Sequence, residues 1–316
     1  MLKFVFHRLV GAVLTLAAAS VLIFVVLEVL PGDPALVMLG EGARPDTLAA
    51  LRTEMGLDQP AVVRFFAWIG GLFAGDLGLS HTYGTPVLDM LAERCLVTLP
   101  LAGFALLLAL PVGVGLGTLA AALRGRLPDH LLMVLGHLGL ALPSFWIGIL
   151  LIMTFPVSLN LGSAGGFPGW QAGAGLALAA LVLPALALAV PEAAILARVT
   201  RGAVLETLGA DFVRVARAKG LSRGRVIRRH VIGHAALPVV TIAGLQFGVL
   251  MAGAILVERV FAIAGLGDLL FNAAGDRDLP VIKGTVLLIC GVVIAANLLV
   301  DVIHASLDPR PRSAAS

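Results

Sequence analysis

Charged residues are scarce in this sequence. Only 13% of its 316 residues are Asp, Glu, Lys or Arg, whereas 59% are hydrophobic and the mean hydropathy is +1.02. Soluble globular domains carry about 25% charged residues, because their surfaces face water. The deficit extends over the whole chain, so it argues against an ordinary soluble protein and predicts a polytopic membrane protein.

Cysteine and the motifs of common active sites are also scarce. Cys95 and Cys290 are the only two cysteines, and neither a disulfide framework nor a metal-site spacing follows from them. The sequence has no Gly-x-x-x-x-Gly-Lys-Ser/Thr phosphate loop and no His-Glu-x-x-His motif. We therefore expect a chain that is not an ATPase or other enzyme and that holds no metal or cofactor of its own.

Six apolar runs are long enough to cross a bilayer, which takes about 20 residues. They cover roughly residues 9–30, 97–122, 131–156, 176–197, 239–257 and 284–303. The first run is longer than the apolar core of a signal peptide, and no small-x-small cleavage site follows it. Pro111, Pro143, Pro184 and Pro191 interrupt the runs, which membrane bundles tolerate when neighbouring groups satisfy the freed carbonyls. The prediction is an all-α protein with six transmembrane helices.

The distribution of charge predicts the orientation. Most of the 22 Lys and Arg residues lie near the two termini, around residue 125 and in segment 198–236, whereas segment 31–96 is acidic. The positive-inside rule then places both termini and segment 198–236 in the cytoplasm. The chain divides into a tail and first span (1–30), an extracytoplasmic segment (31–96), a five-helix core (97–310) and a cytoplasmic tail (311–316). Within 31–96, helices are expected around 45–55 and, with amphipathic character, around 61–73.

A dense basic stretch, residues 211–230, lies within segment 198–236. On a helix over 208–219, Leu208, Phe212 and Val215 form one apolar stripe with Arg214 and Arg217 on the other side. Gly220 is a natural helix terminator, and Ser222 can cap a second helix that runs into the fifth span. Basic residues here can meet lipid phosphates, or the stripe can dock into a groove on a cytosolic protein. A nucleic-acid site is disfavoured, because the chain has no recognition module and is tethered to the membrane.

The residues of this stretch resemble a known family. The sequence RVARAKGLSRGRVIRRHVIGHAALP (214–238) is similar to the EAA loop of binding-protein-dependent ABC importers, in the form found in dipeptide/oligopeptide/nickel permeases. Further matching motifs occur in order along the chain: LPGDPA (30–35), MGLDQP (55–60), GDLGLS (75–80), PVLDML (86–91), ERVFAIAGLGDLL (258–270), RDLPVIKG (277–284) and NLLVDVIHASLDPR (297–310). The family pattern differs at Arg214 and Val215, which replace Glu-Ala, at Ala264, which replaces Pro, and at Leu279, which replaces Tyr.

The resemblance implies a type I ABC importer permease in the inner membrane, whose cytoplasmic coupling helix docks on an ATPase. It also implies the partners: a second homologous permease subunit, two ABC ATPase subunits that bind ATP and Mg²⁺, an extracytoplasmic substrate-binding protein and the lipid bilayer. The residues assigned to ATPase coupling are Leu208, Asp211, Phe212, Arg214, Val215, Ala216, Arg217, Ala218, Lys219, Gly220 and Leu221. The transported solute stays open, since such permeases carry dipeptides, oligopeptides, nickel chelates, glutathione-like compounds or sugars.

Polar residues inside the predicted spans are candidates for the translocation path. They are Ser144, Glu192, Gln246 and Asn297. Glu192 is the most notable, because an acid inside a membrane is costly and by default suggests a function. A structural role is favoured over substrate contact, since Glu192 follows Pro191 and lies within about two turns of Arg198. A secondary transporter without ATPase partners is the alternative, but it would be expected to show an internal repeat, and none is visible.

Overall fold

The computed structural model describes residues 2–29, 33–40 and 42–307, and within these ranges the chain is helical and has no β-strand. The elements are α1 (Leu2–Val29), α2 (Pro34–Leu39), α3 (Pro45–Glu54), α4 (Ala61–Phe73), α5 (Val87–Ala122), α6 (Leu127–Ala141), α7 (Ser144–Ile152), the π-helix η1 (Met153–Ser158), the 3₁₀ turn η2 (Trp170–Ala172), α8 (Ala174–Leu208), α9 (Asp211–Ala218), α10 (Arg223–Val226), the π-helix η3 (Ile227–Val231), α11 (Ile232–Val260), α12 (Leu266–Asp276) and α13 (Leu279–Leu307).

Five of the predicted spans are continuous apolar helices. They are Phe6–Glu28, Val87–Ala122, Ala174–Leu208, Gly224–Val260 and Leu279–Ile303. Most are longer than the apolar runs predicted; α5 begins at Val87, inside the segment assigned to 31–96. Pro111, Pro184 and Pro191 lie within helices as expected.

The third predicted span, 131–156, is not one straight helix. It is split into α6 and the α7–η1 helix, which meet at an angle of 96°, so the bundle has six spans only if this bent pair counts as one. Leu142 is extended (φ −93°, ψ 124°), because a residue before proline is pushed out of the helical region by the ring of Pro143. Pro143 was expected to interrupt this run, and the interruption is a sharp bend.

The centre of the bundle is the contact between α5 and α8, the largest between any two helices of the described chain. Gly113 and Gly117 allow it: a Cβ on Gly117 would lie 2.3 Å from the carbonyl oxygen of Ala197, and one on Gly113 2.6 Å from the Cβ of Leu196. This spacing is the small-xxx-small pattern by which membrane helices approach closely. The apolar core around Leu101, Leu181, Leu188, Leu250 and Phe261 extends from this contact to α11.

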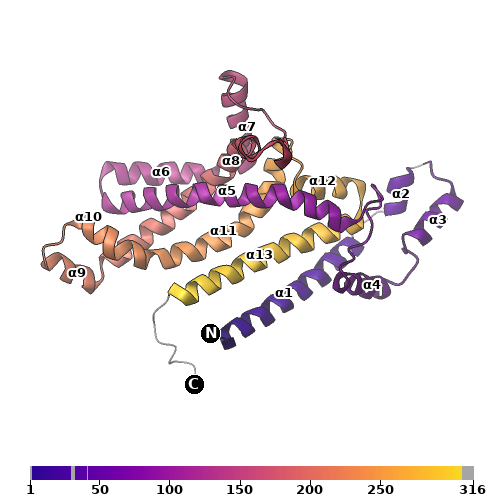
Figure 1. Ribbon diagram of the computed structural model, residues 1–316, viewed down its shortest axis with the longest axis horizontal. Helices are drawn as coiled ribbons and strands as arrows, with labels where there is room; N and C mark the ends of the chain where they lie inside the picture. Colours follow the sequence, from indigo (N-terminus) through magenta and orange to yellow (C-terminus); the bar gives the residue numbers. More distant parts are fainter. Residues whose placement is uncertain (1, 30–32, 41, 308–316) are drawn as a thin grey trace.

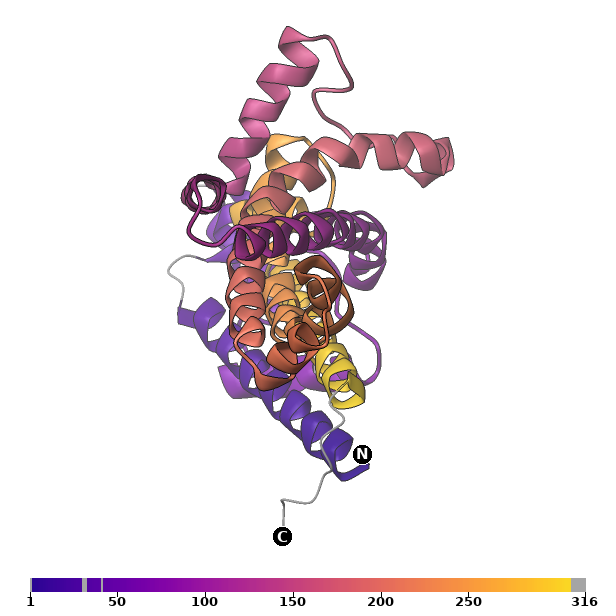
Figure 2. The same ribbon diagram turned by 90° about the vertical axis from the view of Figure 1, so that its left-hand side faces the viewer.

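The helix α1 lies at one side of the bundle beside α13, opposite the side from which α7 projects (Figures 1 and 2). Arg8 of α1 and Asp301 of α13 join the two helices through an ion pair of 3.0 Å.

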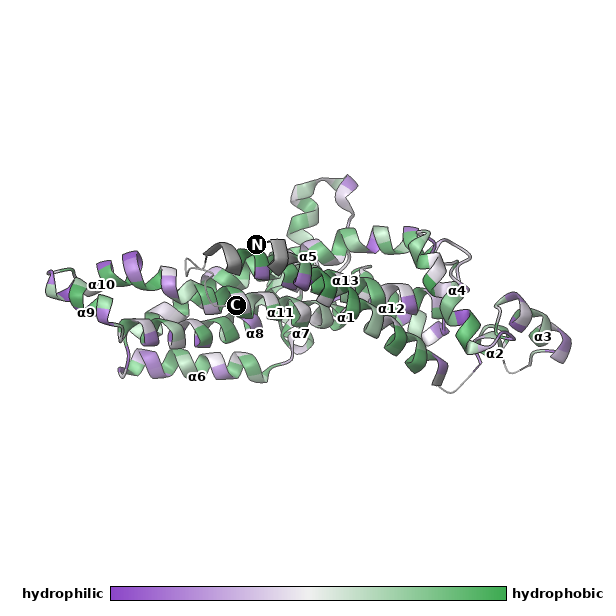
Figure 3. Ribbon diagram, turned by 90° about the horizontal axis from the view of Figure 1, so that it is seen from below, coloured by the Kyte–Doolittle hydropathy of each residue, from purple (hydrophilic) through white to green (hydrophobic). Residues whose placement is uncertain are grey.

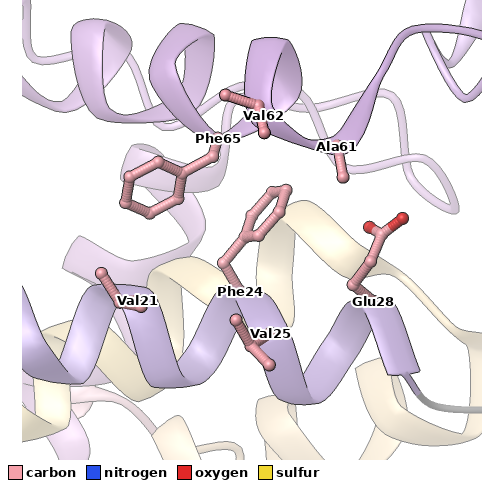
Figure 4. Close-up of a pocket in the computed structure, with 7 residues that line it drawn as sticks. All are labelled: Val21, Phe24, Val25, Glu28, Ala61, Val62 and Phe65. Carbon is pink, nitrogen blue, oxygen red and sulfur yellow. The ribbon is translucent and has the colours of Figure 1, made fainter.

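Between α1 and α4 the side chains leave a pocket of about 300 Å³. Phe24 of α1 and Phe65 of α4 point toward one another across it, with ring centroids 5.3 Å apart (Figure 4). Glu28, at the end of α1, binds Arg64 of α4 in an ion pair. These contacts attach the amphipathic α4 to the first span.

Hydrophilic residues gather at the two ends of the long helices, around α9–α10 and around α2–α4, and the helices between them are mostly hydrophobic (Figure 3). We call these the α9 end and the α2–α4 end. The helices predicted around 45–55 and 61–73 are confirmed as α3 and α4. At the α9 end, Arg201 of α8 forms a bidentate pair (2.7 and 2.8 Å) with the buried carboxylate of Asp129 on α6.

Candidate coupling surface and transport pathway

The basic stretch folds into a separate short helix, α9. The prediction of one helix over 208–219 was wrong, because α8 ends at Leu208 and a turn at Gly209 and Ala210 separates it from Asp211. Asp211 lies in the first turn of α9 and Arg217 in the last, where each charge interacts favourably with the helix dipole.

Gly220 ends α9 in the left-handed conformation predicted for it, with φ +84°. The amide of Gly220 donates to the carbonyl of Arg217 (2.9 Å), and that of Leu221 donates to the carbonyl of Ala216 (3.3 Å). These two bonds form a Schellman motif, and the apolar contact that accompanies it joins Leu221 to the cluster that contains Ala216. The chain then turns sharply and α10 begins at Arg223.

One face of α9 is buried against the bundle. Val213 and Ala216 belong to an apolar cluster with Val204 of α8, Val231 of η3 and Ala235 of α11. Leu208 and Leu221 pack partly buried at the edge of this cluster. Three of the predicted coupling residues, Leu208, Ala216 and Leu221, therefore hold α9 in place rather than form its outer face.

The outer face of α9 carries two exposed apolar side chains among charges. Phe212 is 39% exposed and Val215 is 53% exposed. Around them are the exposed residues Asp211, Arg214, Arg217, Ala218 and Lys219, and Arg214 pairs with Asp211 at 3.3 Å. The ring of Phe212 stacks on the ring of His234 from α11, with centroids 4.9 Å apart and planes inclined by 29°. We call Phe212, Val215 and these charged residues the α9 surface.

After the turn at Gly220, the basic segment runs through α10 and η3 into the fifth span, as predicted. Val226, Ile227 and Val231 are buried, whereas Arg225, Arg228 and Arg229 are exposed. The stretch Gly220-Leu221-Ser222-Arg223-Gly224 has the Gly-x-Ser-x-Gly spacing of a nucleophile elbow. That elbow requires a preceding β-strand, and here helix α9 precedes the turn, so the spacing indicates no hydrolase.

Two of the four polar residues predicted inside spans contact each other. Nε2 of Gln246 on α11 donates to Oε2 of Glu192 on α8 at 2.9 Å. Glu192 is 3% exposed, so the carboxylate lies between helices and not on an open surface. Ser144, the first residue of α7, faces Gly253 of α11, and Asn297 lies partly buried on α13. The geometry supports a structural role for Glu192 in the described conformation.

Glu258, which the sequence interpretation did not single out, connects three helices at the C-terminal end of α11. It is fully buried, and its Oε1 accepts from the Thr98 hydroxyl of α5 at 2.6 Å. Its Oε2 accepts from the backbone amides of Gly267 (2.8 Å) and Asp268 (3.1 Å), and Thr98 Oγ1 accepts from the amide of Leu266 (2.7 Å). A carboxylate thus caps the first turn of α12 and joins it to α5 and α11.

Asp278 makes a similar junction at the start of α13. The carboxylate is buried and accepts from the Ser80 hydroxyl and from the amide of Thr82 at 3.2 Å. Beside it, burial lowers the pKa of His81, an effect that Asp278 opposes and Lys283 reinforces. Glu258 and Asp278 lie within the motifs ERVFAIAGLGDLL and RDLPVIKG. Only the three-dimensional contacts reveal that their side chains act as caps.

Within residues 2–29, 33–40 and 42–307, no group of three or more His, Cys, Asp or Glu is arranged to hold a metal ion. The features that remain are a bundle of apolar spans, a short helix with exposed apolar and charged side chains at one end, and capped helix junctions at the other. They define the class of multi-span helical membrane proteins.

The chain belongs to the family described as binding-protein-dependent transport system inner membrane component. The model of this family matches residues 113–313, and the model of its N-terminal region matches residues 1–102. The chain is 40% identical over 313 residues to a putative peptide transport system permease protein of Brucella abortus, covering 99% of each chain. It is 40% identical to the glutathione transport system permease protein GsiC of Escherichia coli O6:H1 and 39% identical to the dipeptide transport system permease protein DppB of E. coli K12, again over 99% of each chain.

The fold is similar to that of a solved chain of the MetNI methionine ABC transporter, captured in an inward-facing conformation. The TM-score is 0.57 at 18% identity, over 70% of this chain and 97% of that one. This likeness shows the fold, and it confirms the prediction of a type I ABC importer permease architecture.

Proposed function

We propose that this chain is a permease subunit of an ATP-driven importer and forms half of a translocation path for dipeptides, oligopeptides or a related small solute such as glutathione. The observation that carries the proposal is the similarity, over nearly the full length of both chains, to permeases named for peptide, dipeptide and glutathione transport. The substrate class comes from those relatives, because no side chain of the described residues identifies a particular solute.

The partners follow from this assignment. Two ABC ATPase subunits would bind ATP and Mg²⁺, since this chain has no phosphate loop of its own. A second, homologous permease subunit would complete the path, and an extracytoplasmic substrate-binding protein would deliver the solute. In this arrangement the chain lies in the inner membrane with both termini and the α9 end in the cytoplasm, and residues 31–96 face outward.

The α9 surface is proposed to dock on an ATPase subunit. Phe212 and Val215 supply an apolar centre, and Arg214, Arg217 and Lys219 supply a charged rim, which is the usual composition of a specific interface. The buried face of α9, held by Val213 and Ala216, makes the helix move with α8 and α11. Closure of the ATPases on ATP would then move these spans as rigid bodies and switch access to the path.

The residues proposed for the path itself are Ser144, Glu192, Gln246 and Asn297. In the described conformation, the side-chain amide of Gln246 donates a hydrogen bond to the carboxylate of Glu192. A role in the path would require α8 and α11 to separate there during the switch, so that the amide and the carboxylate become available to the solute.

Transport measurements test the proposal. We expect the purified chain alone to show no ATP hydrolysis, because it lacks the phosphate-binding loop. The complex with its ATPases and second permease, reconstituted in proteoliposomes with the binding protein, should accumulate a labelled peptide or glutathione when ATP and Mg²⁺ are present. ATP hydrolysis by the isolated chain, or accumulation that is independent of the ATPases, would contradict the assignment.

Labelling from one side of the membrane tests the orientation. In a Cys95→Ser, Cys290→Ser background, the single variants Asp46→Cys and Arg225→Cys place one thiol at each end of the bundle. An impermeant maleimide added outside spheroplasts should label Asp46→Cys and should reach Arg225→Cys only after the membrane is opened. Labelling of both from outside would overturn the proposed topology.

A further inference from the structure

Phe212, the largest apolar side chain on the α9 surface, already has a partner within the chain. Its ring stacks on His234 at a centroid distance of 4.9 Å, and it still leaves 39% of the residue exposed. One face of the ring is therefore turned to α11 while the rest is available to another protein. A ring in this position can contact a docking partner and the fifth span at the same time.

The imidazole of His234 is held in a fixed orientation. Its Nδ1 lies 2.8 Å from the carbonyl oxygen of His230, one turn earlier, so Nδ1–H is the donor. The neighbouring residue Ala235 is buried in the same cluster as Val213 and Ala216 of α9. The N-terminal turn of α11 is thus held in place where it meets Phe212.

The helix that carries His234 runs the length of the bundle. The 29 residues of α11 extend about 43 Å at 1.5 Å per residue. Its other end carries Glu258, which is bonded to α5 and α12. A displacement of α9 that reaches α11 at His234 is therefore applied to a helix whose far end controls the position of α12.

We propose that His234 is a positioning residue, which holds the Phe212 ring in the orientation presented to an ATPase subunit and transfers the movement of α9 to α11. The proposal rests on the proposed function, since it takes α9 as the docking helix. It differs from a role of His234 within its own helix, because it requires the ring of residue 234, and not its hydrogen bond to His230, for coupling in the assembled complex.

Two substitutions separate the ring from the hydrogen bond. His234→Asn keeps a donor close to the position of Nδ1 but has no ring, and His234→Phe keeps a ring but has no donor. His137→Asn is the matched control, because the exposed His137 on α6 has the same bond to the carbonyl four residues earlier, at 2.6 Å from Met133. The variants are made in the assembled complex, and substrate-stimulated ATP hydrolysis and uptake are measured per assembled complex.

We expect His234→Asn to lower stimulated hydrolysis and uptake about three- to tenfold, the range that corresponds to the loss of one aromatic contact. His234→Phe should stay close to the parent protein, and so should His137→Asn. Normal coupling in His234→Asn would overturn the proposal, and so would an equal loss in His234→Phe, because the hydrogen bond would then be the cause. An equal loss in His137→Asn would also overturn it.

The proposed function and this inference fail in different ways. If Phe212→Ala and His234→Asn both leave assembly and coupling unchanged, α9 is not the docking helix. If Phe212→Ala impairs assembly while His234→Asn is normal, the docking role stands and only the role of His234 is rejected.

Discussion

Replacing Glu258 by alanine should destabilise the protein more than any other single change at the α2–α4 end. The substitution leaves the buried amide of Gly267 and the partly buried amide of Asp268 without an acceptor, and it removes the acceptor of the buried Thr98 hydroxyl. Each unsatisfied buried donor costs about 1–3 kcal/mol, so we expect a loss of about 3 kcal/mol or more in the free energy of unfolding. Glu258→Gln should be milder, because its amide oxygen can still accept from the first turn of α12.

The glycines that surround this carboxylate provide a second, independent test. A Cβ on Gly267 would lie 2.3 Å from the Cα of Ile255 and 3.0 Å from Glu258 Oε2, so Gly267→Ala must displace α12 from α11. Gly275 lies on the same helix with open space around it, and Gly275→Ala should be neutral or stabilising by about 1 kcal/mol through helix propensity. Thermal unfolding in detergent, followed by size-exclusion chromatography, measures both. Equal stability of the two alanine variants would show that the junction is not tightly packed.

The importance of Glu258 could not be predicted from sequence. The predicted span 239–257 ends one residue before it, so an acid there looks like an ordinary charge at a membrane boundary. Its donors are Thr98, far away along the chain, and two amides that become available only because α12 folds back toward α11. Periodicity and composition describe one element at a time, and a cap shared by three helices leaves no local pattern.

The spans and the amphipathic helices were predictable for a different reason. Long apolar runs can satisfy their backbone groups in a membrane only as helices, so hydropathy alone indicates them. Likewise, α3 begins directly at Pro45, a favourable first residue, and α9 ends at Gly220, a residue suited to positive φ. Each of these signals acts within one turn of chain.

The orientation of α9 was harder to predict from sequence, because a two-turn helix can have more than one apolar face. Phe212 with Val215, and Val213 with Ala216, have equally good helical spacing. Only the contacts with Val204, Val231 and Ala235 show that the second pair is buried. The bend at Pro143 is similar: proline predicts an interruption, and the angle of 96° depends on how α6 and α7 pack against α8.

Phe212→Ala should impair assembly with the ATPase subunits. If the exposed part of the Phe212 ring enters a groove on the partner, its removal deletes an aromatic anchor at a cost of about 2–4 kcal/mol in binding free energy. Arg214→Ala should have a smaller effect, since Arg214 lies on the rim and pairs with the exposed Asp211. A rim charge mainly changes the association rate and its dependence on salt. If basic residues instead served to contact lipid phosphates, the order of the two effects would be reversed.

Gly220→Val should have an effect of a different kind. The position has open space around it, so a side chain would not clash, but a β-branched residue cannot adopt φ +84° without strain. The Schellman bonds from Gly220 and Leu221 would break, and α9 would present Phe212 at a different angle. Gly224→Val is the matched control, because Gly224 is equally open and lies in helix α10 with no positive φ. Co-purification of the ATPase subunits and substrate-stimulated ATP hydrolysis are measured for Phe212→Ala, Arg214→Ala, Gly220→Val and Gly224→Val. We expect Phe212→Ala and Gly220→Val to lose co-purification and stimulation, and Gly224→Val to keep them. Normal assembly and stimulation in Phe212→Ala would show that α9 is only a solvated basic segment.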